Sequence, residues 1–307
     1  MRKKITTIGG GTGQYTLLRG LKNYDIDLTA VVSMVDNGGN TGKLRDEFGV
    51  LPPGDLRMCL VALSEESEVL RRLFEHRFKN DCVGNIIIAA SQKIVGKENY
   101  IQEIAKILNT AGQVLPITVK ETNVYAETSA GRTLEGQVNV SYNVGKNEKI
   151  KKIWLKPKVA IFKKAREALL NSNLIVICPG DLYGSILPNF LIKGVVETIK
   201  KSKAKIVYVC NLVNKQGTYG FGAKNFVKEI EKYLKRKIDV VILNKKKPTK
   251  KIVDKYKGEH SAFIQPNIRN SGKKVIRANL LLEHKTNGKI IARHDPKETA
   301  KVIMKLI

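Results

Sequence analysis

The stretch Lys4-Ile5-Thr6-Thr7-Ile8-Gly9-Gly10-Gly11-Thr12-Gly13-Gln14-Tyr15-Thr16-Leu17-Leu18 decides the fold. Its apolar first part predicts a strand, and four glycines within the next five residues predict a tight loop. A helix-like pattern follows from Gln14 to Lys22, with Leu17, Leu18 and Leu21 on one side. Strand, glycine loop and helix in this order are typical of the first unit of an α/β protein.

The rest of the chain repeats this alternation. The apolar run Leu28 to Val35 predicts a second, buried strand, and Asp55 is expected to be the N-cap of a helix that ends near Leu63. Short β-rich pieces over about 114–155 predict a small antiparallel insertion. Further strands are expected at 174–178, 205–210 and 240–243, and further helices at 159–170, 187–200, 223–234 and from Pro296 as position N1. We therefore expect one doubly wound, mostly parallel α/β domain over 1–307, with a β-rich insertion.

The composition argues for a folded protein and limits its partners. With 307 residues, 42% of them hydrophobic, the chain can bury a sizeable core. The formal charge of +27 is compatible with nucleic-acid binding. The excess Lys is spread over 146–164, 200–205, 228–237 and 245–257 without a recognition motif, however, so we expect solvated faces and no nucleic-acid partner.

Other classes are disfavoured by local patterns. The first apolar run is too short for a signal peptide and no run reaches the length of a membrane span, so a cytoplasmic location is expected. The four cysteines and four histidines are scattered, which predicts reduced, buried thiols and no metal site built from them.

The first glycine loop is a candidate anion site. Gly10, Gly11, Thr12 and Gly13 precede the first helix, where backbone N–H groups converge. The spacing is G-x-G-x-G and not the dinucleotide fingerprint G-x-G-x-x-G, so NAD is not specified and an NAD(P)-dependent oxidoreductase is a weak hypothesis. A tight turn that only packs is the alternative.

A second loop of turn-forming residues follows the second strand. Asp36, Asn37 and Gly38 lie where open sheets bind ligands, and Asp36 is a candidate for a sugar hydroxyl or for Mg²⁺. Lys43 would meet phosphate if this loop folds over the first one. Alternatively, Asp36 only makes an Asx-turn with Gly38.

A third loop, Pro179 to Ser185, also follows an apolar strand. Asp181 is a candidate base, metal ligand or hydroxyl acceptor, and Ser185 a hydrogen-bond donor. Helix capping is the alternative for both. Asn211 offers a donor and an acceptor after the next strand, and Asn189 completes the third loop.

These motifs, in this order, resemble the YvcK/CofD family. The resemblance covers nearly the whole chain through a set of ordered segments: Gly9 to Gly13, Asp36 to Leu44, Pro52 to Arg57, Gly84-Asn85, Pro179 to Asn189, Asn211-Leu212 and Arg293-His294-Asp295. It implies a Rossmann-like fold and one of two functions. One branch is a Mg²⁺-dependent 2-phospholactate transferase, and the other is the gluconeogenesis factor branch, which binds UDP-sugars such as UDP-N-acetylglucosamine and supports cell shape.

The resemblance also implies roles for individual residues. Gly10 to Gly13 would serve a diphosphate and Asp36 the base or ribose, with Asp181, Ser185 and Asn189 on a shared rim. Arg293 would contact phosphate or sugar, unless it only forms a surface salt bridge. The Pro52-Pro53 run and the Arg293 tail resemble the gluconeogenesis factor branch.

Two departures from the family pattern bear on the choice between the branches. Asn37 stands where the family usually has a second acid, which weakens a Mg²⁺ site, and the segment after Asn211 lacks the expected Pro-Gly-Glu-Thr pattern. We therefore expect a UDP-sugar-binding regulator that assembles with further copies of itself. A transferase using Asp36 or Asp181 with Mg²⁺ is the alternative.

Overall fold

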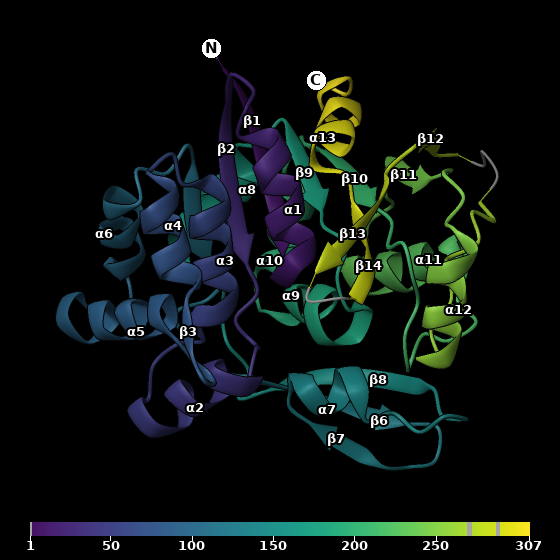
Figure 1. Ribbon diagram of the computed structural model, residues 1–307, viewed down its shortest axis with the longest axis horizontal. Coiled ribbons are helices and arrows are strands. Elements are labelled where there is room, and N and C mark those ends of the chain that lie inside the picture. Colours follow the sequence, from purple (N-terminus) through teal and green to yellow (C-terminus); the bar gives the residue numbers. More distant parts are fainter. Residues whose placement is uncertain (1, 269–271, 287–288) are drawn as a thin grey trace.

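A parallel sheet forms the centre of the molecule (Figure 1). The computed structural model describes residues 2–268, 272–286 and 289–307. Within them, seven strands pair in the order β12-β11-β10-β9-β1-β2-β5, and every neighbouring pair is parallel. The strands are β1 (Lys3–Gly9), β2 (Ile26–Val32), β5 (Gln113–Pro116), β9 (Leu174–Ile177), β10 (Lys205–Val209), β11 (Val240–Asn244) and β12 (Lys274–Ala278). The predicted mostly parallel α/β fold is confirmed.

The strand order reverses beside the first strand. From β1 the chain proceeds through β2 to β5 in one direction, and from β9 through β10 and β11 to β12 in the other. The loop that follows β1 therefore leads in one direction along the sheet, and the loop that follows β9 leads in the other. This divergence leaves a crevice at the carboxyl ends of the two strands. Open α/β sheets bind their ligands at this point.

Helices cover both faces of the sheet. In Figure 1, α1 (Gly11–Leu21) and α13 (Pro296–Met304) lie in front of the strands, with α3 (Pro53–Leu63) packed on α1. Behind them α8 (Lys163–Leu170) packs on α10 (Val195–Lys201). The core between these layers is apolar and includes Cys59, Cys178 and Cys210. Cys82 is buried outside this cluster, so all four cysteines are buried and free, as predicted.

The remaining elements complete the chain. They are α2 (Gly39–Phe48), α4 (Glu68–Glu75), β3 (Arg77–Phe78), β4 (Asp81–Cys82), α5 (Val83–Val95), α6 (Tyr100–Ile107), the π-helix η1 (Leu182–Ile186), α9 (Pro188–Leu191), α11 (Ala223–Leu234), α12 (Lys250–Gly258), β13 (Leu281–Thr286) and β14 (Lys289–His294). No helix among the described residues is both long and apolar enough to cross a membrane.

The β-rich insertion has different bounds from those predicted. β6 (Asn123–Thr128), β7 (Thr133–Glu135) and β8 (Ile150–Lys156) form an antiparallel sheet in the order β7-β6-β8, and α7 (Gln137–Tyr142) lies between β7 and β8. Residues 114–116 instead belong to β5, because Ala30 to Val32 of β2 pair with them. The separate sheet therefore begins at 123, after the edge of the central sheet.

Four other predictions need correction. Asp55 is not an N-cap, because Pro52 is the N-cap of α3 and Asp55 is its third residue. The expected helix 187–200 is divided into α9 and α10, since Gly194 lies between them with φ of +94°. Helix 159–170 begins only at 163, because the N–H groups of residues 161 and 162 donate to Lys193 and Ile117. Strand 28–35 is β2, which ends at 32.

Candidate functional site

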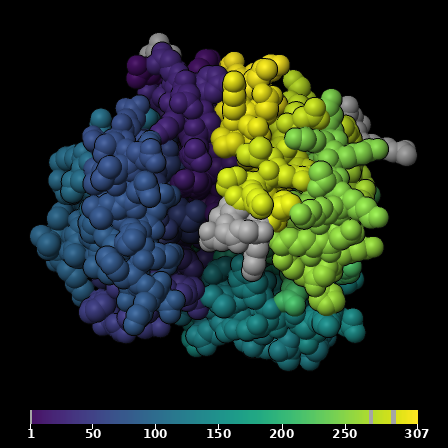
Figure 2. Space-filling model, viewed as in Figure 1, coloured from purple at the N-terminus to yellow at the C-terminus, as the bar shows by residue number. Residues whose placement is uncertain are grey.

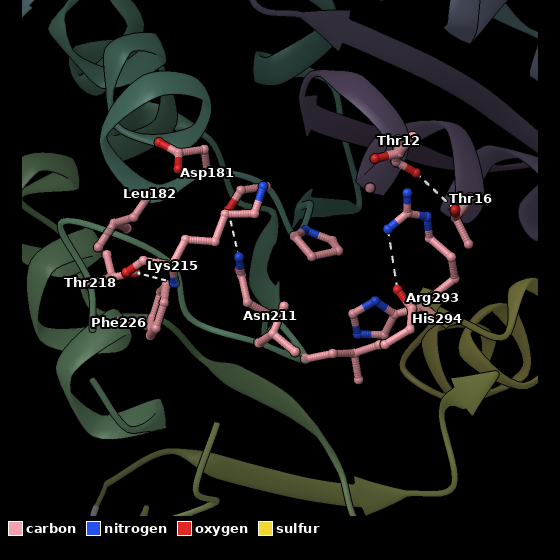
Figure 3. A pocket seen from close by; sticks show the side chains of 16 residues that line it. Thr12, Thr16, Asp181, Leu182, Asn211, Lys215, Thr218, Phe226, Arg293 and His294 are labelled. Atoms are coloured by element: carbon pink, nitrogen blue, oxygen red, sulfur yellow. Dashed lines mark hydrogen bonds between the residues drawn. The ribbon is translucent and has the colours of Figure 1, made fainter. Parts of the chain in front are cut away.

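Two adjoining cavities lie at the crevice between β1 and β9. The Arg293 cavity, about 150 Å³, is lined in part by Thr16, Asn211, Arg293 and His294. The Asp55 cavity, about 170 Å³, is lined in part by Ser33, Asp36, Asp55, Tyr142 and Ser185. Both share one wall, formed by Thr12, Gly13, Gly180, Asp181 and Lys215. The two cavities therefore form one cleft. Figure 3 shows the residues that line the Arg293 cavity.

The first glycine loop contributes to the shared wall because its glycines have no side chains and can approach neighbouring backbone closely. A Cβ atom on Gly13 would collide with the backbone carbonyl of Pro179, and one on Gly10 with the carboxylate of Asp55. Gly11 adopts φ of +61°, a left-handed conformation that favours glycine, and it opens α1. The free N–H groups at the start of α1 are thus held next to the third loop.

Three carboxylates surround the Asp55 cavity. Burial, together with the neighbouring charge of Asp36, raises the pKa of Asp55 to about 8. Burial also raises the pKa of Asp36, against hydrogen bonds from Gly38 and Thr41. The pKa of Asp181 is raised by burial as well. At neutral pH this cavity therefore holds carboxyl groups that take up protons readily or attract a cation.

Asp36 forms the Asx-turn, and Asp181 the helix cap, that the sequence offers as alternatives to a ligand-binding role. The Asp36 carboxylate accepts a hydrogen bond of 3.0 Å from the Gly38 N–H, which closes an Asx-turn. The Asp181 carboxylate accepts one of 2.6 Å from the Gly184 N–H and so caps η1. Each side chain also lines the Asp55 cavity, so these bonds fix its position there.

Lys215 carries a positive charge into the shared wall. Its ammonium group lies 5.3 Å from the centre of the Tyr142 ring, and both side chains line the Asp55 cavity. The charge of Lys215 also favours the ionised form of Asp181. Neither Lys215 nor Tyr142 was predicted as a site residue. The loop that carries Lys215 and the helix α7, which carries Tyr142, are far apart in the sequence and meet only in the folded chain.

Arg293 faces the other end of the cleft. Figure 3 shows its side chain extended towards Thr12, at the N-terminus of α1, and one guanidinium N–H donates to the Ala292 carbonyl at 3.2 Å. Arg293 forms no ion pair with any residue that the structure describes, so the expected alternative of a surface salt bridge is not observed. Its charge is available to a ligand.

His294 and Asn211 form the floor beneath Arg293. The ring of His294 lies 3.1 Å from the carbonyl oxygen of Cys210, and burial lowers the pKa of His294 to about 4. The Asn211 amide donates to the Gly180 carbonyl and accepts from the Tyr208 hydroxyl. The side chains of His294 and Asn211 thus join β14, β10 and the third loop.

Other predicted site residues support the cleft from outside. Lys43 pairs with Asp81 at 3.5 Å, and Asn37 accepts a hydrogen bond from the Val138 N–H. Asn189 is buried and donates to the carbonyl groups of Ser185 and Ile186. None of Asn37, Gly38, Lys43 and Asn189 lines either cavity.

Asp55 and Ser33 are lining residues that the sequence reasoning missed. The Asp55 carboxylate accepts a hydrogen bond from the Gly11 N–H, so α3 contributes directly to the glycine loop. The Ser33 hydroxyl is buried, and no partner for it is found among the described residues. The Pro-Pro-Gly-Asp sequence could have indicated the position of Asp55. Its two prolines favour a helix that begins before the acid, which places Asp55 inside the first turn.

Comparison with known proteins agrees with this architecture. The family described as 2-phospho-L-lactate transferase CofD matches residues 5–281. A relative from Thermotoga maritima is 38% identical over 99% of both chains. The Bacillus subtilis protein named Gluconeogenesis factor is 34% identical over 100% of this chain and 98% of its own.

Solved structures give the same result. Two crystal structures of a Bacillus halodurans protein, one of them described as a member of the UPF0052 family, have TM-scores of 0.91 and 0.92. Each is 32% identical in sequence and covers 99% of this chain, with 100% and 99% of its own length covered in turn. This chain therefore belongs to the CofD family, together with proteins named gluconeogenesis factor.

Proposed function

We propose that this protein binds a UDP-sugar such as UDP-N-acetylglucosamine in the cleft and acts as a cytoplasmic regulator of carbon metabolism and cell shape. The single observation that supports this most is the shared wall, where Thr12 and Gly13 at the start of α1 meet Lys215. A diphosphate at this wall would receive backbone N–H groups, a helix N-terminus and a cation.

The two cavities suit the two ends of such a ligand. Asp36 and Ser33 in the Asp55 cavity offer acceptors and a hydroxyl to the ribose or base. Arg293 in the other cavity offers donors to a phosphate or to the sugar. The name of the Bacillus subtilis relative supports the assignment to carbon metabolism, and the roles in cell shape and in the cytoplasm rest on the family resemblance.

A thermal-shift panel tests the ligand class, because a ligand that binds only the folded state raises the unfolding temperature. UDP-N-acetylglucosamine, UDP-glucose, GDP, NAD and NADP are compared with and without Mg²⁺. We expect UDP-sugars to raise the midpoint whether or not Mg²⁺ is present. A response to NAD alone would instead favour an oxidoreductase.

Arg293→Ala tests the cationic contact. Loss of a hydrogen bond to a charged group costs about 1.5–3 kcal/mol, so we expect the dissociation constant for UDP-N-acetylglucosamine to rise by about tenfold or more. Isothermal titration calorimetry measures it. Lys297→Ala is the matched control, since this exposed cation lies nearby on α13 and lines neither cavity. Unchanged affinity of the Arg293 variant would reject the role.

One observation favours the Mg²⁺-dependent transferase as a second candidate. Asp36 and Asp55 are neighbouring, partly buried carboxylates whose repulsion a divalent cation would remove. Mg²⁺ commonly takes one or two carboxylates and completes its shell with substrate phosphates and water. The pair fits this pattern, although no group of three His, Cys, Asp or Glu ligands occurs in the described part of the chain.

In that case Asp36 and Asp55 would hold the ion, and the ion would neutralise charge on a phosphate-linked group during transfer. Thr12, Gly13 and Lys215 would still bind and orient the phosphates. A thermal shift with GDP that requires Mg²⁺, without a shift for UDP-sugars, would favour the transferase over the regulator.

A further inference from the structure

A third cavity lies at the carboxyl ends of β10 and β11, outside the cleft. Its volume of about 300 Å³ exceeds that of either cavity of the cleft. Pockets that hold small molecules in proteins begin at about this size. The cavity is lined by three segments, Cys210 to Leu212, Leu243 to Pro248 and Phe263 to Pro266. The second segment contains three consecutive lysines, so we call this space the lysine cavity.

The loop after β10 separates the lysine cavity from the cleft. Asn211 and Leu212 in this loop line both the lysine cavity and the Arg293 cavity. The loop is held from the cleft side by His294, whose ring lies 3.1 Å from the Cys210 carbonyl oxygen. It is also held by the Ile264 N–H, which donates to the Leu212 carbonyl at 2.9 Å. The two spaces are therefore neighbours with a fixed wall between them, and a ligand can occupy one without entering the other.

One part of the lining carries an excess of positive charge. Lys245, Lys246 and Lys247 are exposed, and none of them pairs with a carboxylate among the residues that the structure describes. Figure 2 shows α12, which follows shortly after them, in light green at the surface of the molecule. Of the described residues that line the cavity, none is Asp or Glu. The lysine cavity therefore attracts an anion.

The acid beside this loop is already engaged. The Glu283 carboxylate accepts hydrogen bonds of 2.7 Å from both the N–H and the hydroxyl of Thr249. These bonds, and to a smaller extent the charge of Lys246, lower the pKa of Glu283. A single carboxylate offsets at most one of the three lysine charges, so the excess remains.

Asn244 fixes the backbone of the lysine loop. Its side-chain amide donates to the Lys246 carbonyl at 2.8 Å, and its side-chain oxygen accepts from the Lys246 N–H at 3.1 Å. The same oxygen accepts from the N–H groups of Leu280 and Leu281. The loop is thus positioned before a ligand arrives, which reduces the ordering that binding would otherwise require.

Another part of the lining is apolar. Phe263 is partly buried, and its ring packs edge to face against Tyr256, with 5.6 Å between the ring centres. Leu212, Pro248 and Ile264 add further apolar lining. A flat or apolar group in the cavity would therefore contact a ring whose orientation is already fixed.

We propose that the lysine cavity binds a small organic phosphate, with its phosphate at the lysines and an apolar ring against Phe263. A phosphate monoester carries nearly two negative charges at neutral pH, which suits several neighbouring ammonium groups better than a single carboxylate does. Inorganic phosphate would leave the apolar lining in contact with water. The proposal does not depend on which ligand the cleft binds.

Phenyl phosphate is the smallest probe that has both parts of such a ligand. NMR titration of the full chain measures its dissociation constant beside those of two comparison probes. Inorganic phosphate lacks the ring, and benzoate has the ring with only one charge. We expect phenyl phosphate to bind about tenfold more tightly than either of them.

Three variants test the lining residues. Lys246→Ala combined with Lys247→Ala removes two of the charges, so we expect the dissociation constant for phenyl phosphate to rise by about tenfold or more. Lys200→Ala combined with Lys201→Ala is the matched control, because these exposed lysines on α10 line none of the three cavities. Phe263→Leu should weaken phenyl phosphate by roughly fivefold and leave inorganic phosphate unchanged.

Arg293→Ala distinguishes the lysine cavity from the cleft, and we expect it to leave the affinity for phenyl phosphate unchanged. Circular dichroism spectra that superimpose show that each variant is folded. The proposal would be overturned by equal affinities for phenyl phosphate and inorganic phosphate. It would also be overturned if the Lys246 and Lys247 pair had no effect, if the Lys200 and Lys201 pair had the same effect, or if Arg293→Ala lowered the affinity instead.

Discussion

Asp55 is the residue whose environment differs most from that of an ordinary surface acid. It lies in α3 next to Asp36, with only part of its surface open to the cleft, and both circumstances disfavour its ionised form. Its hydrogen bond from Gly11 opposes this effect only in part. The carboxyl group is therefore poised to respond to pH or to a cation in the cleft.

The raised pKa of Asp55 makes folding stability depend on pH. The folded protein keeps a proton up to about pH 8, whereas the unfolded chain releases it near the ordinary value of 3.8. This contribution to stability is fully present below pH 3.8 and is lost as the pH rises to about 8. We expect Asp55→Asn to match the wild type in stability near pH 4 and to exceed it by about 1–3 kcal/mol at pH 8.

Thermal unfolding of both proteins, followed by circular dichroism across this pH range, measures the difference. The asparagine side chain keeps an oxygen that accepts from the Gly11 N–H, so the substitution removes the charge and not the hydrogen bond. Asp25→Asn is a suitable control, because that carboxylate is exposed on the opposite end of β2. A stability difference that does not vary with pH would contradict the assignment.

At the scale of elements, close backbone contact holds the glycine loop against the third loop. Gly13 lies against the Pro179 carbonyl, and Gly20, two turns further along α1, lies against the Pro296 carbonyl at the start of α13. One helix is thus packed tightly at both ends. Its N-terminus consequently has a fixed position in the cleft.

A methyl group at position 13 should separate these loops. Gly13→Ala would place Cβ against backbone that has no freedom to rotate away, so we expect a loss of about 2 kcal/mol or more in unfolding free energy, and weaker ligand binding. Urea denaturation measures the first effect and calorimetry the second. In Gly258→Ala, the control, Cβ meets open space at the end of α12, and stability should stay equal or rise slightly.

Local patterns predicted those parts of the site that depend on one segment. The glycine loop, the third loop and Pro296 at N1 of the last helix lie where the sequence places them, since glycine, proline and apolar periodicity act over a few residues. Asp55 was wrongly predicted as an N-cap, because Pro52 and Pro53 start the helix before it. Lys215, Tyr142 and Ser33 line the cleft through contacts between distant segments, which a local pattern does not contain.

At the scale of the whole molecule, positive charge is unevenly distributed. Residues 48–107 contain eight Lys and Arg and eight Asp and Glu side chains, so their formal net charge is zero, and the lysine-rich remainder carries the net +27. Such a surface attracts polyanions without a site that reads their sequence. We therefore expect weak, general attraction to nucleic acid and no sequence-specific binding.

Fluorescence anisotropy with a random DNA duplex distinguishes the two possibilities. Nonspecific binding should weaken by about a thousandfold between roughly 50 and 200 mM salt, because it depends on the release of counterions. A UDP-sugar held by a few groups in the cleft should lose much less affinity over the same range. Tight DNA binding that persists at about 150 mM salt would reopen the nucleic-acid hypothesis.

The hydrogen bond between the His294 ring and the Cys210 carbonyl connects the β13–β14 hairpin, near the end of the chain, to the middle of the sheet. Arg293 lies directly beside His294 in this hairpin. A growing polypeptide that still ends before residue 293 can already contain β1, β9 and β10, yet its crevice lacks the guanidinium. Ligand binding should therefore be stronger on molecules whose synthesis has passed this point. The ligand would then stabilise the finished protein more than an incomplete chain.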